Sequence, residues 1–171
     1  ISASNPTGRK WFQVSGKLMQ IDVSDSHVVG TNSQHHIYRS PVEERPVRLQ
    51  PVITGYWNRI PGRLTKISKG ESGVWGTSRT DHIYKLNADG RTWTQISGAK
   101  VQVSSGKSVW GVNRSNMIYK YQGNNWWQRV TGRFTYVDVS DNDHVWGINT
   151  RQQLYRRTRD TWQNIKFNGR A

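Results

Sequence analysis

Val74-Trp75-Gly76, Val109-Trp110-Gly111 and Val145-Trp146-Gly147 repeat one phrase of three residues, and Val28-Val29-Gly30 is a fourth copy in which valine replaces tryptophan. The four glycines lie 46, 35 and 36 residues apart along the chain. A steady period of this length is typical of structural repeats that stack on one another. The chain is therefore predicted to consist of about four similar units.

A second landmark keeps the same period independently. Tryptophans recur 36, 34 and 35 residues apart at Trp57, Trp93, Trp127 and Trp162. Trp11 precedes this series by 46 residues, so both landmarks place one longer interval between Ser40 and Tyr56. We expect an insertion at about 41–56, because its prolines suit an exposed loop and not a central strand. These prolines are Pro41, Pro46 and Pro51.

Each unit contains four short segments rich in Val, Ile, Trp, Tyr and Thr, separated by Gly, Ser, Asn or Asp, which is typical of strands and turns. In the clearest unit these segments are approximately 64–68, 74–78, 83–86 and 92–97. The short connections favour antiparallel neighbours, and no segment keeps a helical period with caps. The sequence predicts an all-β fold, a β-propeller of four-stranded antiparallel blades in a single domain over residues 1–171.

Counting from each Trp, the repeat units span approximately 11–56, 57–92, 93–126 and 127–161, with a partial unit at 162–171. This leaves five strands that begin with Trp but four of every other kind. If each blade instead begins after the glycine that follows the Trp segment, the strand at 11–14 is the surplus one. We expect a closed four-bladed ring; the alternative is an incomplete ring whose open edges pair with a second copy.

The repeated residues have simple structural interpretations. The glycine of Val-Trp-Gly allows backbones or rings to approach closely, and its tryptophan fills space between blades. This applies to Trp75, Trp110 and Trp146, while the second tryptophan series is expected to do similar work on another strand.

Composition restricts the classes of partner and chemistry. The 171 residues include no cysteine, which excludes disulfides, thiolate metal sites and a cysteine nucleophile. No apolar run approaches the roughly 18 residues that suggest a membrane span. The formal net charge is +14, from 25 Lys and Arg against 11 Asp and Glu. Such a protein attracts polyanions, and the attraction weakens as salt rises.

Several ordered motifs resemble a known family. The string Trp93-Thr-Gln-Ile-Ser-Gly98, followed by Val109-Trp-Gly-Val-Asn113 and Ile118-Tyr-Lys120, is similar to the tectonin repeat of tachylectin-type and fish-egg lectins. Related strings cover residues 11 to about 166. The resemblance implies a β-propeller lectin that binds bacterial or modified glycans, in innate defence or egg protection, without catalysis. Members commonly close about six blades, which at this period needs about 210 residues.

Two positions carry a cation in the repeats. Directly after Ile/Leu-Tyr stand Arg39, Lys85, Lys120 and Arg156. One or two residues after the glycine of the Trp segment stand Lys17, Arg63, Lys100 and Arg133. In a radially symmetric fold these cations form two rings that can bind a multivalent anion; alternatively, they only deter aggregation at strand edges. Further cations make the last unit the most positive, namely Arg151, Arg157 and Arg159.

Polar and aromatic candidates complete the predicted site. Asn32, Asn113 and Asn149 each lie two residues after a repeated glycine, where an amide can bind a sugar hydroxyl pair or cap a turn. Trp126 stands outside the repeat register beside Tyr121, and an aromatic ring near a loop can support the apolar face of a sugar. Packing is the alternative for both rings.

Catalysis and metal binding find little support. The five histidines have no metal-ligand spacing, and several recur in register with the repeats. Paired carboxylates suited to glycoside hydrolysis are not apparent. A calcium site at the two Asp-Val-Ser-Asp segments, which begin at Asp22 and Asp138, is a weak alternative. We expect no catalytic residue, no metal and no cofactor.

The leading hypothesis is a secreted, non-enzymatic lectin that binds acidic microbial glycans such as lipopolysaccharide through repeated shallow sites between blades. The competing hypothesis is a general polyanion binder or scaffold, with a sulfated glycan, nucleic acid or a mineral phase as partner. A homo-oligomer is compatible with both. The extracellular location rests on the resemblance alone.

Overall fold

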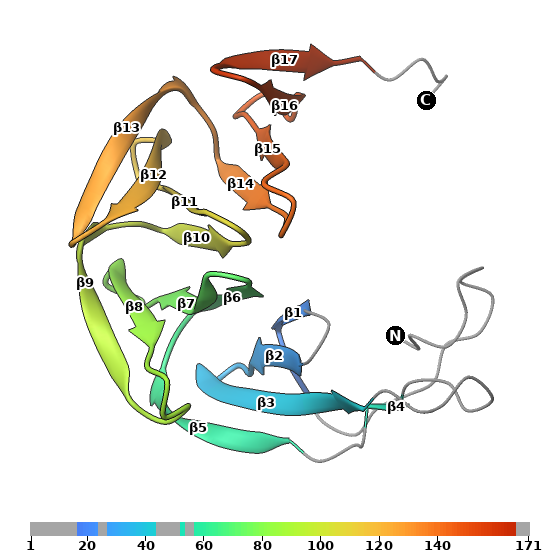
Figure 1. Cartoon of the computed structure of the whole chain (residues 1–171), viewed down its shortest axis with the longest axis vertical. Coiled ribbons are helices and arrows are strands. Elements are labelled where there is room, and N and C mark those ends of the chain that lie inside the picture. The colour runs from blue at the N-terminus through green and yellow to red at the C-terminus, as the bar shows by residue number, and fades with distance from the viewer. Residues whose placement is uncertain (1–16, 24–26, 44–51, 54–56, 167–171) are drawn as a thin grey trace.

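The computed structural model describes residues 17–23, 27–43, 52–53 and 57–166, which form four antiparallel β-sheets (Figure 1). Sheet 1 contains β1 (Gln20–Val23), β2 (His27–Thr31), β3 (His36–Glu43), β4 (Val52–Ile53) and β5 (Asn58–Arg63). Sheet 2 contains β6 (Lys66–Gly70), β7 (Gly73–Thr77), β8 (His82–Leu86) and β9 (Trp93–Ala99). Sheet 3 contains β10 (Gln102–Ser105), β11 (Val109–Val112), β12 (Met117–Gly123) and β13 (Trp126–Arg133). Sheet 4 contains β14 (Tyr136–Val139), β15 (Val145–Ile148), β16 (Leu154–Thr158) and β17 (Thr161–Ile165).

In sheets 2 to 4 the strands follow one another as a four-stranded meander, and in sheet 1 β5 takes the fourth place by pairing with β3, with the short β4 added beside it. The prediction of four-stranded antiparallel blades is confirmed. Each blade begins after the glycine of the Trp segment, and its last strand contains the repeated tryptophan or, in sheet 1, directly follows it. This is the second of the two divisions that the sequence allowed. The surplus strand expected at 11–14 lies outside the described residues.

The insertion at 41–56 differs from the expected loop at its first residues. β3 continues through Pro41 to Glu43, and its end pairs with β4. Pro41 is opposite His27 of β2, so this proline lies in a strand. The correction has a physical reason: proline lacks an amide donor but is compatible with strand ends that do not need that hydrogen bond. Pro46 and Pro51 lie outside the described residues.

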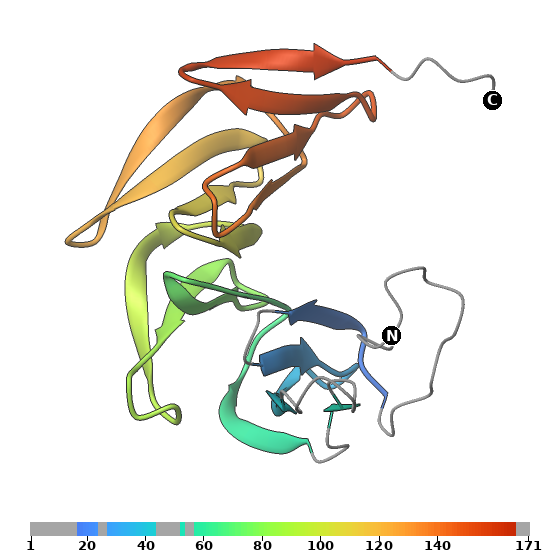
Figure 2. The same ribbon diagram turned by 45° about the vertical axis from the view of Figure 1, so that its right-hand side comes forward.

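The four sheets stand side by side in an arc, with their first strands toward the centre (Figures 1 and 2). β1 packs against β6, β6 against β10, and β10 against β14. Between the strands described here, no comparable packing joins sheet 4 back to sheet 1, and Figure 1 shows these sheets at the two ends of the arc. The described sheets therefore do not form the expected closed four-bladed ring, because only three packed boundaries, each between sequential neighbours, join them.

The hydrophobic core consists of three clusters, one at each boundary between neighbouring sheets. The interface between sheets 1 and 2 buries Val29, Ile37, Ile60, Leu64, Ile67 and Val74. The interface between sheets 2 and 3 buries Trp75, Ile83, Ile96, Val103 and Val109. The interface between sheets 3 and 4 buries Trp110, Val112, Ile118, Phe134, Val137, Val139 and Val145. The prediction that Trp75 and Trp110 pack between blades is confirmed, whereas Trp146 of the last described sheet is only half-buried.

The glycine of Val-Trp-Gly and the glycine of the Trp segment are needed for different structural reasons. A Cβ atom on Gly76 would lie 2.6 Å from both Leu64 Cδ1 and the Lys66 carbonyl oxygen, so the Val-Trp-Gly strand has no room for a side chain there. Gly132 has a φ of 117°, in a bulge where the register between β12 and β13 shifts. Its missing side chain leaves room for the indole of Trp162 from the next sheet.

The second tryptophan series joins each sheet to the one before it. The Trp93 indole Nε1 donates to the Pro61 carbonyl oxygen at 2.7 Å. Two equivalent bonds follow around the arc, from Trp127 to Ser97 at 2.9 Å and from Trp162 to Thr131 at 2.8 Å. Every acceptor directly precedes a glycine of the Trp segment. The Trp and Gly of this motif therefore meet across an interface, one repeat apart.

Near the centre of the arc, side-chain amides connect neighbouring inner strands. Gln102 donates from Nε2 to the Val137 carbonyl oxygen at 2.8 Å and accepts from the Val137 amide at 3.2 Å. Gln20 makes the same pair of bonds with Ile67 of sheet 2. These bonds fix the positions of successive sheets, which in turn fixes the grooves between them. Within the described residues, no helix is long and apolar enough to cross a membrane.

Candidate functional site

The predicted cations after Ile/Leu-Tyr lie along the open arc of sheets, and three of them cover tryptophans. Lys85, Lys120 and Arg156 are each paired across strands with the tryptophan of Val-Trp-Gly in the same sheet. The cations lie 5.4, 5.6 and 5.7 Å from the centroids of those rings. Arg39 faces Val29, which offers no ring. Each of the other three cations shields an indole ring, and its charged end can meet a ligand only where a groove lies beside it.

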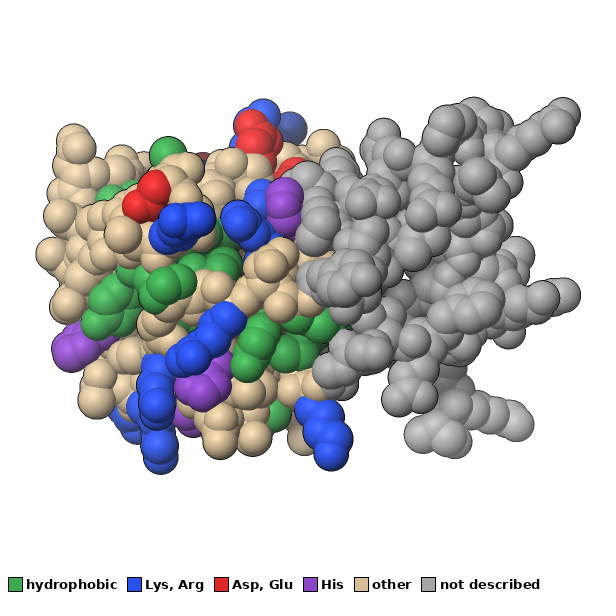
Figure 3. Space-filling model, turned by 90° about the horizontal axis from the view of Figure 1, so that it is seen from below, with side chains coloured by type: hydrophobic (Ala, Val, Ile, Leu, Met, Phe, Trp, Pro, Cys, Tyr) green, Lys and Arg blue, Asp and Glu red, His purple; other side chains and the backbone are tan. Residues whose placement is uncertain are grey.

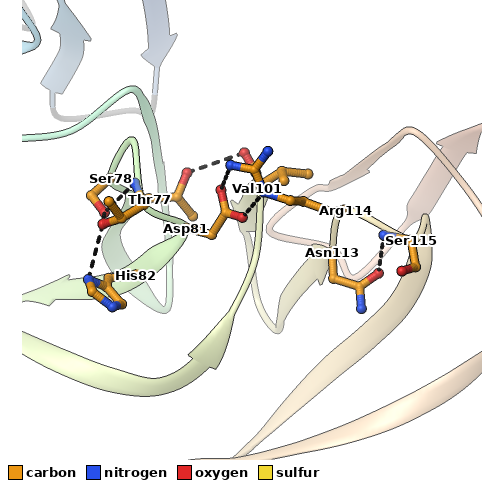
Figure 4. A network of polar contacts seen from close by, with 9 residues as sticks. Thr77, Ser78, Asp81, His82, Val101, Asn113, Arg114 and Ser115 are labelled. Carbon is orange, nitrogen blue, oxygen red and sulfur yellow. Dashed lines mark hydrogen bonds and ion pairs between the residues drawn. The ribbon is translucent and has the colours of Figure 1, made fainter.

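The three predicted asparagines lie in equivalent turns of three different sheets. The Asn113 Oδ1 accepts from the Ser115 amide at 3.1 Å and the Met117 amide at 2.9 Å. Asn32 and Asn149 accept two backbone amides each in the same way. Figure 4 shows the Asn113 turn beside an ion pair between Arg114 and Asp81 of sheet 2. These amide oxygens hold the turns, and the structure does not bring the asparagines together.

Tyr121 and Trp126 differ sharply in accessibility. The Tyr121 ring packs between Trp75 and Trp127, with centroid distances of 5.0 Å to each. Its faces are thus covered, and we leave it out of the proposed site. Trp126 begins β13 at a hairpin tip and is 58% exposed, so its ring is open to solvent. Asn124 and Asn125, both with positive φ, form the adjoining tight turn.

Lys100 does not belong to the second ring of cations. Lys17, Arg63 and Arg133 directly follow their glycines, but Ala99 at the end of β9 stands at that position after Gly98. Lys100 instead occupies the next position, which holds Leu18, Leu64 and Phe134 in the other repeats. It is 4% exposed, and its Nζ lies 4.1 Å from the centroid of the Tyr119 ring and 4.7 Å from that of Trp127. Burial lowers the pKa of Lys100 to about 8.

A groove of about 560 Å³ lies between sheets 3 and 4, and we call it the sheet 3–4 groove. Its size falls within the range of about 300–1,000 Å³ that is typical of small-ligand sites. The lining residues are Trp110, Lys120, Gln122, Gln128, Arg129, Val130, Thr131, Asp143, Val145, Arg157, Arg159 and Asp160. Four of them are cationic and two are carboxylates, so the groove has an excess of positive charge beside apolar side chains.

Arg157 is the most unusual residue of the groove. Its guanidinium lies 5.3 Å from the centroids of both the Trp110 and the Trp162 rings. Nη2 donates to the Asp160 carboxylate at 3.2 Å, while Nη1 is buried without a hydrogen-bond acceptor among the described residues. A buried N–H donor without a partner is unfavourable by about 1–3 kcal/mol. An acceptor brought by a ligand would remove this penalty.

The opposite wall of the groove holds Lys120 in a looser contact. Its Nζ lies 3.9 Å from an Asp143 carboxylate oxygen, beyond hydrogen-bond distance. Asp143 also accepts a hydrogen bond from Ser108, whose hydroxyl accepts from the Trp110 indole at 2.7 Å. Arg129 and Arg159 form no ion pair with any described residue. Two of the four cations therefore have no ion pair among the described residues, and a third, Lys120, is held only by the longer contact with Asp143.

Of the nine predicted binding residues, only Lys120 lines this groove. Arg157 and Arg159 were noted in the sequence as excess charge, and Arg129 was missed. A sequence signal for Arg157 does exist: the residue after each Tyr-cation pair is Ser40, Leu86 and Tyr121 in the earlier repeats, so arginine at this position breaks the pattern. Arg129 has no comparable signal, because its neighbours in the fold come from the next sheet.

Positive charge is also present away from the groove. Seen from below the view of Figure 1, Lys and Arg side chains are more frequent on the described surface than Asp and Glu (Figure 3). In the part of the chain that the structure describes, no three His, Cys, Asp or Glu side chains are grouped so that they could hold a metal ion.

Solved structures of propeller proteins share the fold. Human WBSCR16 superimposes with a TM-score of 0.68 at 8% identity, over 94% of this chain and 56% of that one. Prp20p from Saccharomyces cerevisiae gives 0.61 at 10% identity, over 94% and 52%. YCF48 bound to D1 peptide gives 0.57 at 10% identity, over 86% and 52%. The chain thus spans about half the length of these proteins, and the likeness concerns the fold alone.

No curated protein matches the sequence. The tectonin domain family model matches residues 4–108 and 86–169, which together cover nearly the whole chain. The match agrees with the repeated Trp, Val-Trp-Gly and Ile/Leu-Tyr motifs, and it suggests lectin-like carbohydrate binding. By its repeats, its four-stranded sheets and this match, the chain belongs to the tectonin domain family.

Proposed function

We propose that the protein is a lectin that binds acidic or otherwise modified microbial glycans, such as lipopolysaccharide, with the sheet 3–4 groove as its principal site. The observation that carries this proposal is the lining of that groove, where Lys120, Arg129 and Arg159 stand around apolar side chains. Sugars present both apolar faces and polar groups, and an acidic sugar adds a charge that these cations complement.

Weak sites gain strength when several engage one surface. Exposed Trp126 and the cations Arg39 and Arg156 offer further contacts around the arc. Binding of one glycan-covered surface at several points would raise the overall affinity without any tight single site. This suits a secreted protein of innate defence or egg protection that binds without catalysis.

The proposed site can be tested with a matched pair of variants. Lys120→Ala and Lys85→Ala each remove a cation that covers a tryptophan of the same motif, but only Lys120 lines the groove. On an array of acidic and neutral microbial glycans, we expect Lys120→Ala to weaken binding about twofold to fivefold, as for one partly exposed ionic contact. Lys85→Ala should leave it nearly unchanged. Equal losses for the two variants would contradict the groove as principal site.

The net charge of +14 also favours a second candidate function, a general polyanion binder. Salt separates the two functions. A polyanion binder loses all its acidic ligands together as salt rises, because screening shortens the range of charge interactions to about 3 Å at 1 M. A lectin keeps a preference among sugars, and one free monosaccharide inhibits it at high salt. Heparin and nucleic acid belong on the same array.

We also propose that a second copy covers the two end sheets of the arc. Ile21 of β1 is 45% exposed, whereas its repeat equivalents Ile67 and Val103 are 2% exposed and Val137 is fully buried against the preceding sheet. At the other end Ile148 of β15 is 38% exposed. In the internal interfaces such a face is covered by the opposite face of another sheet, so the two ends of the arc complement each other head to tail.

Light scattering over a range of concentrations tests this association. We expect a mass above that of one chain, which Ile21→Lys reduces to the mass of a monomer. The control Gln95→Lys adds the same charge on the exposed side of β9 and should change nothing. A monomer at every concentration would contradict the second copy as partner.

A further inference from the structure

We infer that the sheet 3–4 groove holds a tetrahedral oxyanion, a phosphate or sulfate group carried on the ligand, at the guanidinium of Arg157, and that Asp160 occupies this place in the free protein. This inference deepens the proposed function, and its glycan part rests on that function. The oxyanion contact itself is argued from Arg157 and its neighbours.

The position of Arg157 is fixed before any ligand arrives. Its guanidinium lies over the Trp110 and Trp162 rings, which contact each other edge to face with centroids 6.2 Å apart. Arginine tolerates such stacking because its charge is delocalised and weakly hydrated, and its planar fork matches an oxyanion with two parallel hydrogen bonds. Lysine has neither property. The two rings thus keep the side chain at the groove, where a turn of the guanidinium about its own axis is the movement that binding requires.

The hydrogen bonds of this guanidinium are incomplete. Nη2 has the Asp160 carboxylate, and Nη1 has no acceptor among the described residues. An oxyanion that takes the place of Asp160 accepts from Nη2, and a small turn of the guanidinium then lets Nη1 donate to a second oxygen. Binding therefore completes a set of hydrogen bonds that the free protein leaves open.

Asp160 is suited to be displaced. Its side chain is fully exposed, and it belongs to the two-residue turn between β16 and β17, where its other neighbours are solvent. An exposed ion pair of this kind contributes little, so an anion with more charge and more acceptor oxygens competes with it. Asp143 restrains Lys120 across the groove in a similar but more distant contact of 3.9 Å.

The remaining cations determine which anion is preferred. Arg129 and Arg159 line the same groove and form no ion pair with described residues. A carboxylate presents two oxygens, whereas a phosphate or sulfate group presents three free oxygens to several donors. The geometry thus favours a phosphorylated or sulfated ligand over a uronic acid.

The experiment compares a hexose 6-phosphate, the same hexose 6-sulfate, the uncharged hexose and inorganic phosphate at constant ionic strength. Binding is followed by calorimetry and by the NMR signals of the tryptophan indole N–H groups, because Trp110 and Trp162 flank the guanidinium. Vesicles that contain phosphatidic acid form a separate arm, so that a lipid headgroup can be distinguished from a sugar phosphate.

Three variants give opposite expectations. Arg157→Gln and Arg157→Lys should each weaken binding of the hexose phosphate about tenfold or more, since a hydrogen-bonded charged pair is lost or reduced to a point charge. Asp160→Asn should strengthen it about twofold to fivefold, because the competing carboxylate is gone. The control Asp81→Asn removes the same charge from the ion pair with Arg114, outside the groove, and should have almost no effect (Figure 4).

Each outcome decides for or against the inference. Unchanged binding in Arg157→Gln, or weaker binding in Asp160→Asn, overturns it; because Asp160 is fully exposed, the second variant remains informative even if changes at Arg157 disturb folding. If inorganic phosphate binds at Arg157 but no glycan binds anywhere, the oxyanion site stands and the lectin function fails. If glycans bind equally well without Arg157, the lectin function stands and this inference fails.

Discussion

The interface between sheets 2 and 3 and the interface between sheets 3 and 4 are built from the same repeat, yet they differ at one position. We call the residue that directly follows the Tyr-cation pair the wedge residue, because it packs between neighbouring sheets. In sheet 3 this residue is Tyr121, whose ring lies 5.0 Å from Trp75 and 5.0 Å from Trp127. In sheet 4 it is Arg157, whose charged end borders an open groove beside Trp110. The comparison shows that the side chain at this one position separates an interface that is closed by packed rings from an interface that borders a groove.

The same interfaces differ again at the residue that fits against the Val-Trp-Gly glycine. Sheet 4 places Phe134 there, edge-on to Trp162 with a centroid distance of 4.6 Å. Sheet 3 places Lys100 there, buried under two aromatic rings. Each interface thus contains one aromatic and one cation, but at exchanged positions. The cation near the edge can meet a ligand, whereas the buried one cannot.

The largest expected effect on stability comes from giving sheet 4 the lysine that sheet 3 has at the position beside the Val-Trp-Gly glycine. Phe134→Lys removes a ring that is 3% exposed and contacts Trp162 and Tyr155. It also buries a charge, although Tyr155 and Trp162 hold the places that Tyr119 and Trp127 hold around Lys100. We expect a loss of about 3–5 kcal/mol in the free energy of unfolding, as for deletion of a core aromatic. Urea denaturation measures it; a loss below 1 kcal/mol would mean that both interfaces tolerate lysine equally.

The reverse exchange, Lys100→Leu, should stabilise the protein in a way that depends on pH. The pKa of Lys100 is lowered from 10.5 to about 8 by burial. Between these values the unfolded chain holds the proton and the folded chain releases it, so the stability of the natural protein rises with pH across this window. The advantage of Lys100→Leu should therefore be about 2–3 kcal/mol smaller at pH 10.5 than at pH 7.

A control variant isolates the titration of Lys100. Lys85→Leu removes a lysine that also lies over a tryptophan ring but is exposed to solvent. The dependence on pH in Lys100→Leu beyond that in Lys85→Leu is then the effect of burial at position 100. If the two variants depend on pH equally, the buried lysine is not desolvated in solution.

The bulge glycines offer a smaller test of the same comparison. A Cβ on Gly132 would lie 3.0 Å from Ile118 Cδ1 and 3.3 Å from Trp162 Nε1, whereas one on Gly98 would lie 3.5 Å from the nearest atom, Lys100 Nζ. Both glycines have positive φ, so alanine strains either bulge by about 1–2 kcal/mol. Gly132→Ala should have the greater effect in thermal denaturation, and equal losses would show that the contacts with Trp162 and Ile118 adjust freely.

Much of the fold could be predicted from the sequence, because the same motifs recur at the same spacing in each repeat. The period of Val-Trp-Gly, the Trp series and the turn residues give the strands and their antiparallel order. The openness of the arc could not be predicted, since the angle between sheets depends on how large rings such as Trp75 and Phe134 pack. The insertion was also only partly readable, because β3 extends through Pro41 to pair with β4.

The site was harder to predict because a repeat describes what its members share. Reasoning from shared positions selected Asn113 and its equivalents, which cap turns, and Lys85 and its equivalents, which cover tryptophans. The groove depends on a departure from the repeat, arginine at 157, and on its neighbours from another sheet. Register mattered too: Lys100 is one residue out of line with Arg63, and that single step moves it from the surface into the core.

The smallest expected effect on stability, and the sharpest test of the comparison, is Arg157→Tyr. This change gives sheet 4 the wedge residue of sheet 3, so the new ring should pack on Trp110 as Tyr121 packs on Trp75. A gain of about 0.5–1.5 kcal/mol in the free energy of unfolding follows from the aromatic contact and from removal of the unpaired Nη1 donor. Binding of hexose phosphate should be lost at the same time, while the reciprocal Tyr121→Arg should destabilise the protein without creating a site, because Lys100 nearby adds a like charge. If Arg157→Tyr kept the phosphate binding, the wedge residue would not be what separates a core from a site, and the difference between the two interfaces would have to come from the strands themselves.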